Sequence, residues 1–124
     1  MDTRTKILTA EAARQIPVPL VVATGYFDVL RAAHIRELGA LREHGPLLVI
    51  VLPIENELLE QRARAELVAA LRMVDYVVTA DRDGADALLE ALKPIRVERL
   101  EAADADRARQ LIQHVHRLHS RPQS

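Results

Sequence analysis

The chain has 124 residues, a length that suits one domain with one modest hydrophobic core. Its 17 basic and 18 acidic residues nearly cancel, and two tyrosines and one phenylalanine offer no stacking platform, so we expect no nucleic-acid partner. Cysteine is absent, which excludes disulfides and thiol chemistry, and no signal-peptide core or membrane-length apolar run is present, so we expect a cytoplasmic protein without membrane association.

The first third of the chain predicts a short helix, a buried strand and a longer helix. Thr9 is suited to cap the first helix, which Pro17 ends. Residues 18–23 form a continuous apolar run, which is typical of a strand buried on both faces. A helix is expected from about residue 32 to residue 43, with an apolar stripe facing inward. That stripe consists of Ile35, Leu38 and Leu41.

The middle of the chain repeats this alternation. Residues 47–52 are a second buried apolar run and residues 75–79 a third, shorter one. Between them, residues 57–72 carry apolar side chains at helical spacing, and Asp83 is expected to cap a further helix over residues 84–93. The inward side chains expected on these two helices are Leu59, Ala63, Leu67, Ala70 and Leu71 on the first, and Leu88, Leu89 and Leu92 on the second.

The last part of the chain predicts one more strand and one more helix. Residues 95–100 alternate as an edge strand does, a helix is expected from Asp104, and residues 120–124 are expected to fray. Strands and helices therefore alternate throughout, which indicates a parallel sheet covered by helices on both faces. We expect a single domain over residues 1–124, of the α/β class and three-layer α/β/α.

The turn after the first predicted strand is the natural place for a ligand, because open parallel sheets bind ligands beyond the carboxyl ends of their strands. Its sequence is TGYFDVLRAAH, residues 24–34. Gly25 would let the backbone approach an anion closely, and the free amides of the turn and of the helix start can donate to phosphate oxygens. Arg31 and His34 are three residues apart, so they would share the first helical turn and could point at one anionic group.

The stretch GYFDVLRAAHIREL, residues 25–38, resembles the signature of the cytidylyltransferase-like nucleotidylyltransferases. That signature runs Gly-x-Phe-Asp, two residues, His-x-Gly-His, and then a leucine. Within this superfamily the chain most resembles the adenylyltransferase domain of ADP-heptose synthase, and the likeness extends to RARAELVAALRMVDYVV (62–78) and DRDGADALLEALKP (81–94). It covers roughly residues 5–95 and implies a Rossmann-like parallel sheet of the nucleotidylyltransferase type.

The resemblance also implies a reaction and a set of site residues. In the family, a sugar-phosphate oxygen attacks the α-phosphorus of a nucleoside triphosphate and pyrophosphate leaves. This implies ATP or CTP as substrate, and Mg²⁺ when a nucleotide is bound. The catalytic candidates, at the positions of the two motif histidines, are Arg31 and His34. The nucleotide-binding candidates are Thr24, Gly25, Tyr26, Phe27, Asp28 and Arg64, of which Asp28 is expected to fix the turn and Arg64 to lie toward the nucleotide.

The chain also departs from the family pattern. Arg31 replaces the first histidine and Ala33 replaces the glycine, so a longer, always charged side chain and an extra methyl change the geometry. The lysine-containing loop after the second strand, the Lys-Gly-Gly-Asp-like segment after the fourth and the Ser/Thr-rich start of the last helix have no counterpart here. We therefore expect a nucleotidylyltransferase-like domain that binds a nucleotide or small phosphorylated molecule, with nucleotidyl transfer weakened or lost.

Structural alternatives exist for these features. His34 can simply cap or pack the helix start, and Arg31 can be a solvated charge. The whole chain can be a non-catalytic structural or regulatory module that keeps the fold for protein contacts, for example as a homodimer. His116 and His119 share a helix face, but no cysteine or well-placed carboxylate completes a set of ligands, so we expect no metal site.

Overall fold

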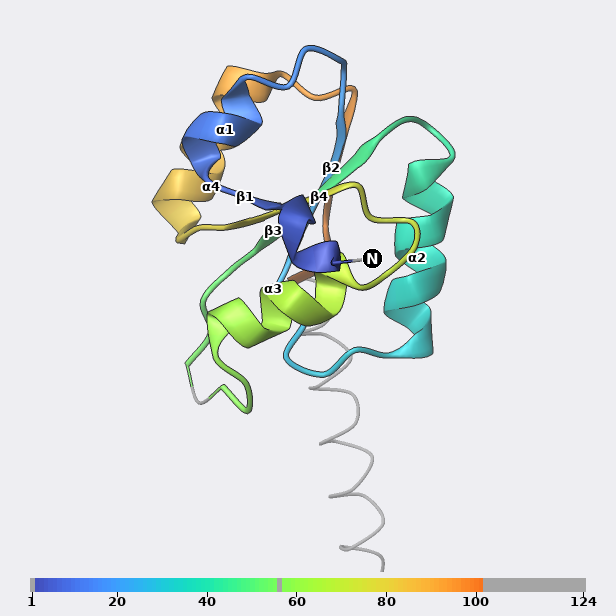
Figure 1. Cartoon of the computed structure of the whole chain (residues 1–124), viewed down its shortest axis with the longest axis vertical. Coiled ribbons are helices and arrows are strands. Elements are labelled where there is room, and N and C mark those ends of the chain that lie inside the picture. The colour runs from blue at the N-terminus through green and yellow to red at the C-terminus, as the bar shows by residue number, and fades with distance from the viewer. Residues whose placement is uncertain (1, 56, 102–124) are drawn as a thin grey trace, which may run out of the picture.

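The computed structural model describes residues 2–55 and 57–101, and these contain one parallel sheet with five strands (Figure 1). The strand order is β1-β4-β3-β2-β5, and every neighbouring pair is parallel. The strands are β1 (Ile7–Leu8), β2 (Val21–Gly25), β3 (Leu47–Val51), β4 (Tyr76–Thr79) and β5 (Arg96–Arg99). The helices are the 3-10 helix η1 (Thr3–Lys6) and the α-helices α1 (Ala10–Arg14), α2 (Ala32–Arg42), α3 (Gln61–Ala69) and α4 (Arg82–Leu92).

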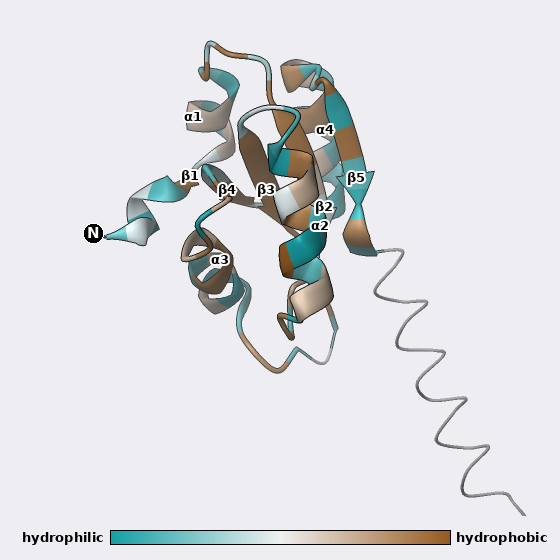
Figure 2. Cartoon of the chain, turned by 90° about the vertical axis from the view of Figure 1, so that its right-hand side faces the viewer, coloured by the Kyte–Doolittle hydropathy of each residue, from teal (hydrophilic) through white to brown (hydrophobic). Residues whose placement is uncertain are grey.

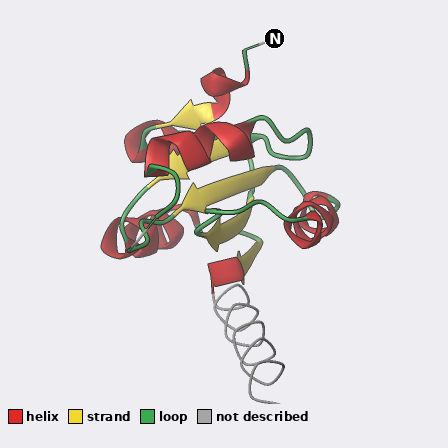
Figure 3. Ribbon diagram, turned by 90° about the horizontal axis from the view of Figure 1, so that it is seen from below, coloured by secondary structure: helices red, strands yellow, loops and turns green. Residues whose placement is uncertain are grey.

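Helices cover both faces of the sheet (Figure 3). Val21 and Ala23 of β2 pack into a cluster with side chains of α2 and α3, whereas Val22 packs into a second cluster with side chains of α1 and α4. All residues of β2 and β3 are buried, and Figure 2 shows the middle of the sheet coloured as hydrophobic. The three-layer α/β class and the Rossmann-like parallel sheet expected from the sequence are therefore confirmed.

The strand order creates a switch point beside β2. From β2 the chain moves to β3 and then β4 on one side, and it returns through α4 to β5 on the other side of β2. Thr24 near the end of β2 pairs in register with Arg99 at the end of β5. The carboxyl ends of β2 and β5 are therefore where the physics of open α/β sheets favours ligand binding.

Two predicted boundaries were wrong. The first long strand covers Val21–Gly25 rather than residues 18–23, because Pro19 has no amide to pair and the ladder begins where Val21 N donates to Pro46 O at 2.9 Å. The helix expected over 57–72 is α3, Gln61–Ala69. It starts late because the amides of Leu58 and Leu59 donate to the Asp28 carboxylate instead of joining a helix.

Parts of the expected inward faces were also wrong. Ile35 is 42% exposed, and on the third helical segment Leu59 and Leu67 are 37% and 45% exposed. The side chains that α3 buries are Arg64, Ala65, Val68 and Ala69. The spacing of apolar residues does not identify this buried face, because the largest side chain on the face is an arginine.

Several other expectations were met. Thr9 caps α1 by accepting from Ala12 N at 3.1 Å, and β5 lies at the edge of the sheet. The short β1 and η1 were not predicted, since two paired residues leave no periodicity to detect. Across residues 2–55 and 57–101, no helix is both long and apolar enough to cross a membrane. The helix expected from Asp104 and the frayed end at 120–124 lie outside the described residues.

The cap of α4 differs from the prediction and gives a test. Asp81, not Asp83, is the N-cap, and its Oδ1 accepts from Gly84 N at 2.6 Å. We expect Asp81→Ala to lower the free energy of unfolding by about 1 kcal/mol. Asp83→Ala, which removes only a first-turn charge, should cost about 0.3 kcal/mol. Urea unfolding of both variants measures the difference, and equal losses would contradict the assignment of the cap.

Candidate phosphate-binding site

The turn that follows β2 is built around the ring of Phe27. Phe27 has a left-handed backbone, with φ of 53°, and its side chain is 1% exposed. A Cβ added to Gly25 would meet the Phe27 ring at 2.7 Å, so the absence of a side chain at Gly25 makes room for this ring. Left-handed backbone is uncommon for a bulky residue and marks a constrained turn. The expected role of Gly25 at a close-lying anion stays a prediction, and the structure adds a packing role.

The turn leads into α2 through Arg31 and His34. Arg31 is the N-cap of α2, and its backbone N–H donates to His34 Nδ1 at 3.0 Å. The His34 ring is 2% exposed and packs edge-on against Phe27, with ring centroids 5.6 Å apart. Because a backbone amide can only donate, Nδ1 of the neutral ring is unprotonated and Nε2 carries the proton. Arg31 itself is exposed, so the two catalytic candidates differ in their access to solvent.

The backbone around this turn offers donors to an anion. The first amides of an α-helix have no partner within the helix, and α2 begins at Ala32, directly after the turn. The N-terminal end of a helix also carries partial positive charge. The exposed guanidinium of Arg31 adds a full positive charge at the same end, and it can bind a phosphate in a bidentate manner.

Asp28 fixes a different loop from the one expected. Its carboxylate accepts from Leu58 N at 3.0 Å and from Leu59 N at 3.0 Å, so it holds the segment that leads into α3. These two backbone hydrogen bonds hold the pKa of the Asp28 carboxyl below its ordinary value, and the nearby charge of Arg64 adds to the effect. Asp28 therefore links the β2–α2 turn to the chain that follows β3.

Arg64 is fully buried, with 0% exposure, at the same edge of the sheet. Its Nη1 donates to Tyr26 O at 2.6 Å and to Leu52 O at 2.7 Å. Its Nε donates to Leu59 O at 3.1 Å, and Nη2 forms an ion pair with Glu57 at 2.9 Å. Sequence comparison with the family singled out Arg64, whereas nothing in the sequence identified Glu57 as its partner.

Thr24 faces a residue that the sequence analysis missed. Its hydroxyl donates to Glu101 Oε2 at 2.7 Å, and Glu101 is only 6% exposed. Arg82, the first residue of α4, lies 3.9 Å from the other carboxylate oxygen. The available signal was position alone, because Glu101 comes two residues after the strand that pairs with β2.

Mg²⁺ is the cation that the family resemblance implies when a nucleotide is bound. Residues 2–55 and 57–101 contain no group of three or more His, Cys, Asp or Glu side chains arranged to hold a metal ion. Mg²⁺ commonly keeps several waters and is held by substrate phosphates with one or two carboxylates. Any Mg²⁺ at this turn would therefore depend on the nucleotide for most of its ligands.

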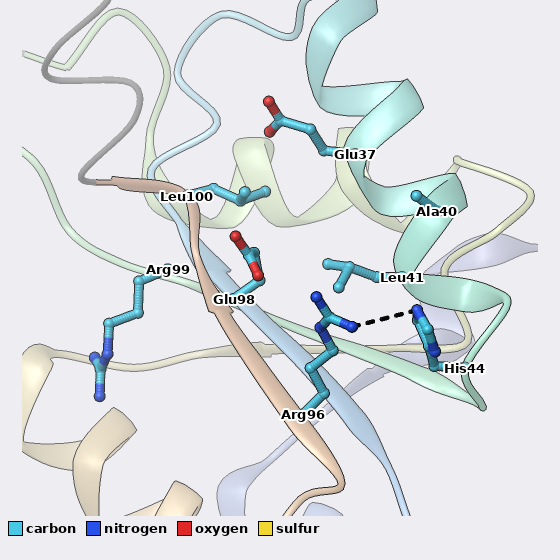
Figure 4. A pocket seen from close by; sticks show the side chains of 8 residues that line it. All are labelled: Glu37, Ala40, Leu41, His44, Arg96, Glu98, Arg99 and Leu100. Atoms are coloured by element: carbon cyan, nitrogen blue, oxygen red, sulfur yellow. Dashed lines mark hydrogen bonds between the residues drawn. The ribbon is translucent and has the colours of Figure 1, made fainter.

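A cavity of about 290 Å³ lies between α2 and β5 (Figure 4). Leu41 and Leu100 contribute apolar surface, while charged side chains of both signs, including Arg96 and Glu98, line the rest. Arg96 Nη1 lies 3.4 Å from His44 Nε2. None of the eight lining residues belongs to the Gly25–Arg31 turn, so this cavity is separate from the candidate phosphate site.

The fold and the site together define a class: a Rossmann-like α/β domain in which the turn at the switch point of the sheet offers hydrogen-bond donors to an anion. No family model matches the chain. It is 33% identical over 104 residues to the bifunctional protein HldE of Geobacter metallireducens, and 35% identical over 104 residues to HldE of Geobacter sulfurreducens. Each match covers 76% of this chain and 21% of the relative, so the chain corresponds to about a fifth of these proteins.

A shorter relative has a more specific name. The chain is 30% identical to the D-beta-D-heptose 1-phosphate adenylyltransferase of Bordetella bronchiseptica, over 74% of this chain and 64% of that protein. The crystal structure of a lipopolysaccharide core biosynthesis protein from Thermoplasma volcanium has the same fold, with a TM-score of 0.59 and 24% identity over 64% of this chain and 71% of that one. The resemblance to the cytidylyltransferase-like superfamily is confirmed, because HldE proteins and a D-beta-D-heptose 1-phosphate adenylyltransferase are among the homologues of the chain.

Gly25→Ala tests the packing of the turn. The new methyl would meet the Phe27 ring at 2.7 Å, so we expect the free energy of unfolding to fall by about 1–3 kcal/mol. Gly39→Ala in α2 is the matched control, because no atom lies within 4 Å of its added Cβ, and it should stabilise by about 0.5–1 kcal/mol. Thermal and urea unfolding report both values. If Gly25→Ala were as stable as the native chain, the account of the turn would be wrong.

Asp28→Asn tests the link between the two loops through pH. The pKa of Asp28 is lowered by folding, so the stability it contributes is complete above the ordinary value of 3.8 and is lost as the pH falls through the lowered pKa. The native chain should therefore be more stable than Asp28→Asn near neutral pH, and this difference should shrink in acid. Urea unfolding from pH 7 downward measures this difference. Asp28→Ala is a control, because it also lacks the charge and its stability should depend on pH as that of Asp28→Asn does. A difference that stays constant into acid would contradict the role of the charge.

Proposed function

We propose that residues 1–124 form one nucleotidylyltransferase-like domain that binds a nucleoside triphosphate, ATP or CTP, or another small phosphorylated molecule at the β2–α2 turn. The observation that carries the proposal is the turn itself: an exposed arginine occupies the N-cap position of α2 at the carboxyl edge of the sheet, and a left-handed Phe27 fixes the path of the chain into the helix. Similarity to a heptose 1-phosphate adenylyltransferase supports ATP as the nucleotide and a sugar phosphate as the acceptor.

The chemistry expected of this site is in-line nucleotidyl transfer. An oxygen of the acceptor phosphate attacks the α-phosphorus, and pyrophosphate leaves, so the protein has to hold and neutralise phosphate charge. Arg31 would bind phosphate oxygens, His34 would help to stabilise the phosphates from the same helical turn, and the first amides of α2 would complete the cradle. Mg²⁺ bound with the nucleotide would neutralise further charge.

We propose that transfer is weakened or lost while binding persists. Arg31 stands where the family has its first motif histidine, and Ala33 adds a methyl where the family has glycine. Thr24, Asp28 and Arg64 already have protein partners at the edge of the sheet. Loss of one preorganised donor to a transition state commonly costs about 100- to 1000-fold in rate, and several are altered here.

A second candidate is a protein-interaction module, for example a homodimer. It is favoured by β5, an edge strand on which every residue is exposed, including Val97 at 37%, with Ile95 just before it at 60%. Apolar side chains on an open strand edge can pack against another chain.

For the nucleotide-binding domain, we propose a cytoplasmic location, where nucleoside triphosphates are available.

The test is a thermal-shift and calorimetric titration with ATP and with CTP, each with and without Mg²⁺. Nucleotide at 100 times its Kd should stabilise the chain by about 2.7 kcal/mol. Arg31→Ala should weaken binding by about tenfold or more through loss of a charge-assisted hydrogen bond. Arg36→Ala, an exposed arginine of the same helix, is the matched control and should bind as the native chain does.

Two further readouts separate the candidates. Release of pyrophosphate from ATP and heptose 1-phosphate measures transfer, and we expect it to be slow or absent. Sedimentation measures self-association, and Val97→Glu should dissociate a dimer formed through β5. No stabilisation by either nucleotide, together with a dimer that Val97→Glu disrupts, would favour the interaction module over the nucleotide-binding domain.

A further inference from the structure

The loops after β2 and β3 are tied together by a single buried side chain. Four of the five N–H groups of the Arg64 guanidinium donate hydrogen bonds to these loops: to Tyr26 O after β2, to Leu52 O after β3, and to Leu59 O and the Glu57 carboxylate further along. The bonds are 2.6–3.1 Å long, and the side chain has no exposed surface. Arg64 would have to break this arrangement to reach a phosphate.

The β2–α2 turn also binds the segment before α3 through a second side chain. Asp28, one residue beyond Phe27, accepts from the amides of Leu58 and Leu59. Arg64 thus holds the carbonyl of Leu59 while Asp28 holds its amide. The charge of Arg64 also favours the ionised form of Asp28. The turn at residues 26–28 and the segment at residues 57–59 are consequently one clamped unit, and neither can move without changing bonds in the other.

We propose that Arg64 is a positioning residue, which sets the conformation of the 26–28 turn from behind and does not itself touch the nucleotide. Its bond to Tyr26 O lies next to Phe27, the residue with the left-handed backbone, and therefore fixes how the chain enters α2. The inference rests on the proposed function for its ligand. Its structural half, that Arg64 holds the turn, can be decided in the absence of any ligand.

A consequence is that ligand binding at the turn is coupled to the 57–59 segment. An anion bound at the start of α2 would order the turn, and Asp28 would transmit that order to the amides of Leu58 and Leu59. Leu58 is 75% exposed, so its amide has little protection apart from this carboxylate. Exchange of these two amides with solvent is therefore a local reporter of the clamp.

The test uses NMR of the full chain, with Arg64→Lys and a matched control. Arg64→Lys keeps the charge but loses the planar fork that reaches several acceptors. Val68→Ala removes buried volume one turn further along α3, at a residue with 0% exposure, and leaves every bond of the clamp in place. In the absence of ligand, we expect the Leu58 and Leu59 amides to exchange about tenfold faster in Arg64→Lys. The Tyr26, Phe27 and Asp28 amide shifts should change too, while Val68→Ala should leave the exchange of the Leu58 and Leu59 amides unchanged.

The second arm needs no variant, so it stands even if Arg64→Lys does not fold. The Nε–H signal of Arg64 is followed in the native chain while MgATP is added to saturation. It should keep its shift and its slow exchange, while the amides of Ala32 and Ala33 move. A large change of the Arg64 signal on binding would make Arg64 a ligand and overturn the inference, as would equal amide exchange in Arg64→Lys and Val68→Ala. If MgATP moves no signal, the proposed function fails, and the ligand-free comparison alone decides whether Arg64 positions the turn.

Discussion

The buried guanidinium of Arg64 imposes a demand that organises one whole edge of the molecule. A charged group without access to water has to find acceptors within the chain, and here they come from the ends of two neighbouring strands and from the segment before α3. Parallel strands deliver their carboxyl ends to the same edge, so the carbonyls of Tyr26 and Leu52 can meet at one side chain. The β2–α2 turn is therefore fixed by a contact that lies outside its own sequence.

This dependence explains what the sequence could predict. Strand and helix alternation, the continuous apolar runs of β2 and β3, and the local cap at Thr9 arise from neighbouring residues, and they led to the correct class of fold. The inward face of α3 and its first residue depend on Arg64 and Asp28, whose partners are up to 38 positions away. Residue spacing carries no information on such contacts, and a charged residue is assigned to the surface by default.

In the candidate site, too, some features could be predicted from the sequence and others depend on distant contacts. The sequence identified the turn, and similarity to a family identified its residues, but the structure gives most of them a second role. Gly25 makes room for Phe27, His34 accepts from the N-cap amide of α2, and Asp28 holds another loop. The Gly-Tyr-Phe-Asp stretch therefore has a structural role in this turn whether or not a ligand binds. Because these residues also build the turn, their presence alone does not report an activity, and binding and transfer have to be measured separately.

The charges at this edge give a bound phosphate a preferred side. Each carboxylate near the turn has a partner: Asp28 accepts from two amides, Glu57 pairs with Arg64, and Glu101 accepts from Thr24. A polyphosphate beside β5 would meet charges of both signs, because Glu101 lies there together with Arg82, 3.9 Å away, and Arg99 of the strand itself. Beside α2 it would meet the exposed Arg31 and the positive end of the helix. The start of α2 would therefore be the preferred side for a phosphate, and the geometry around Arg31, rather than the strand ends alone, would decide what this turn can hold.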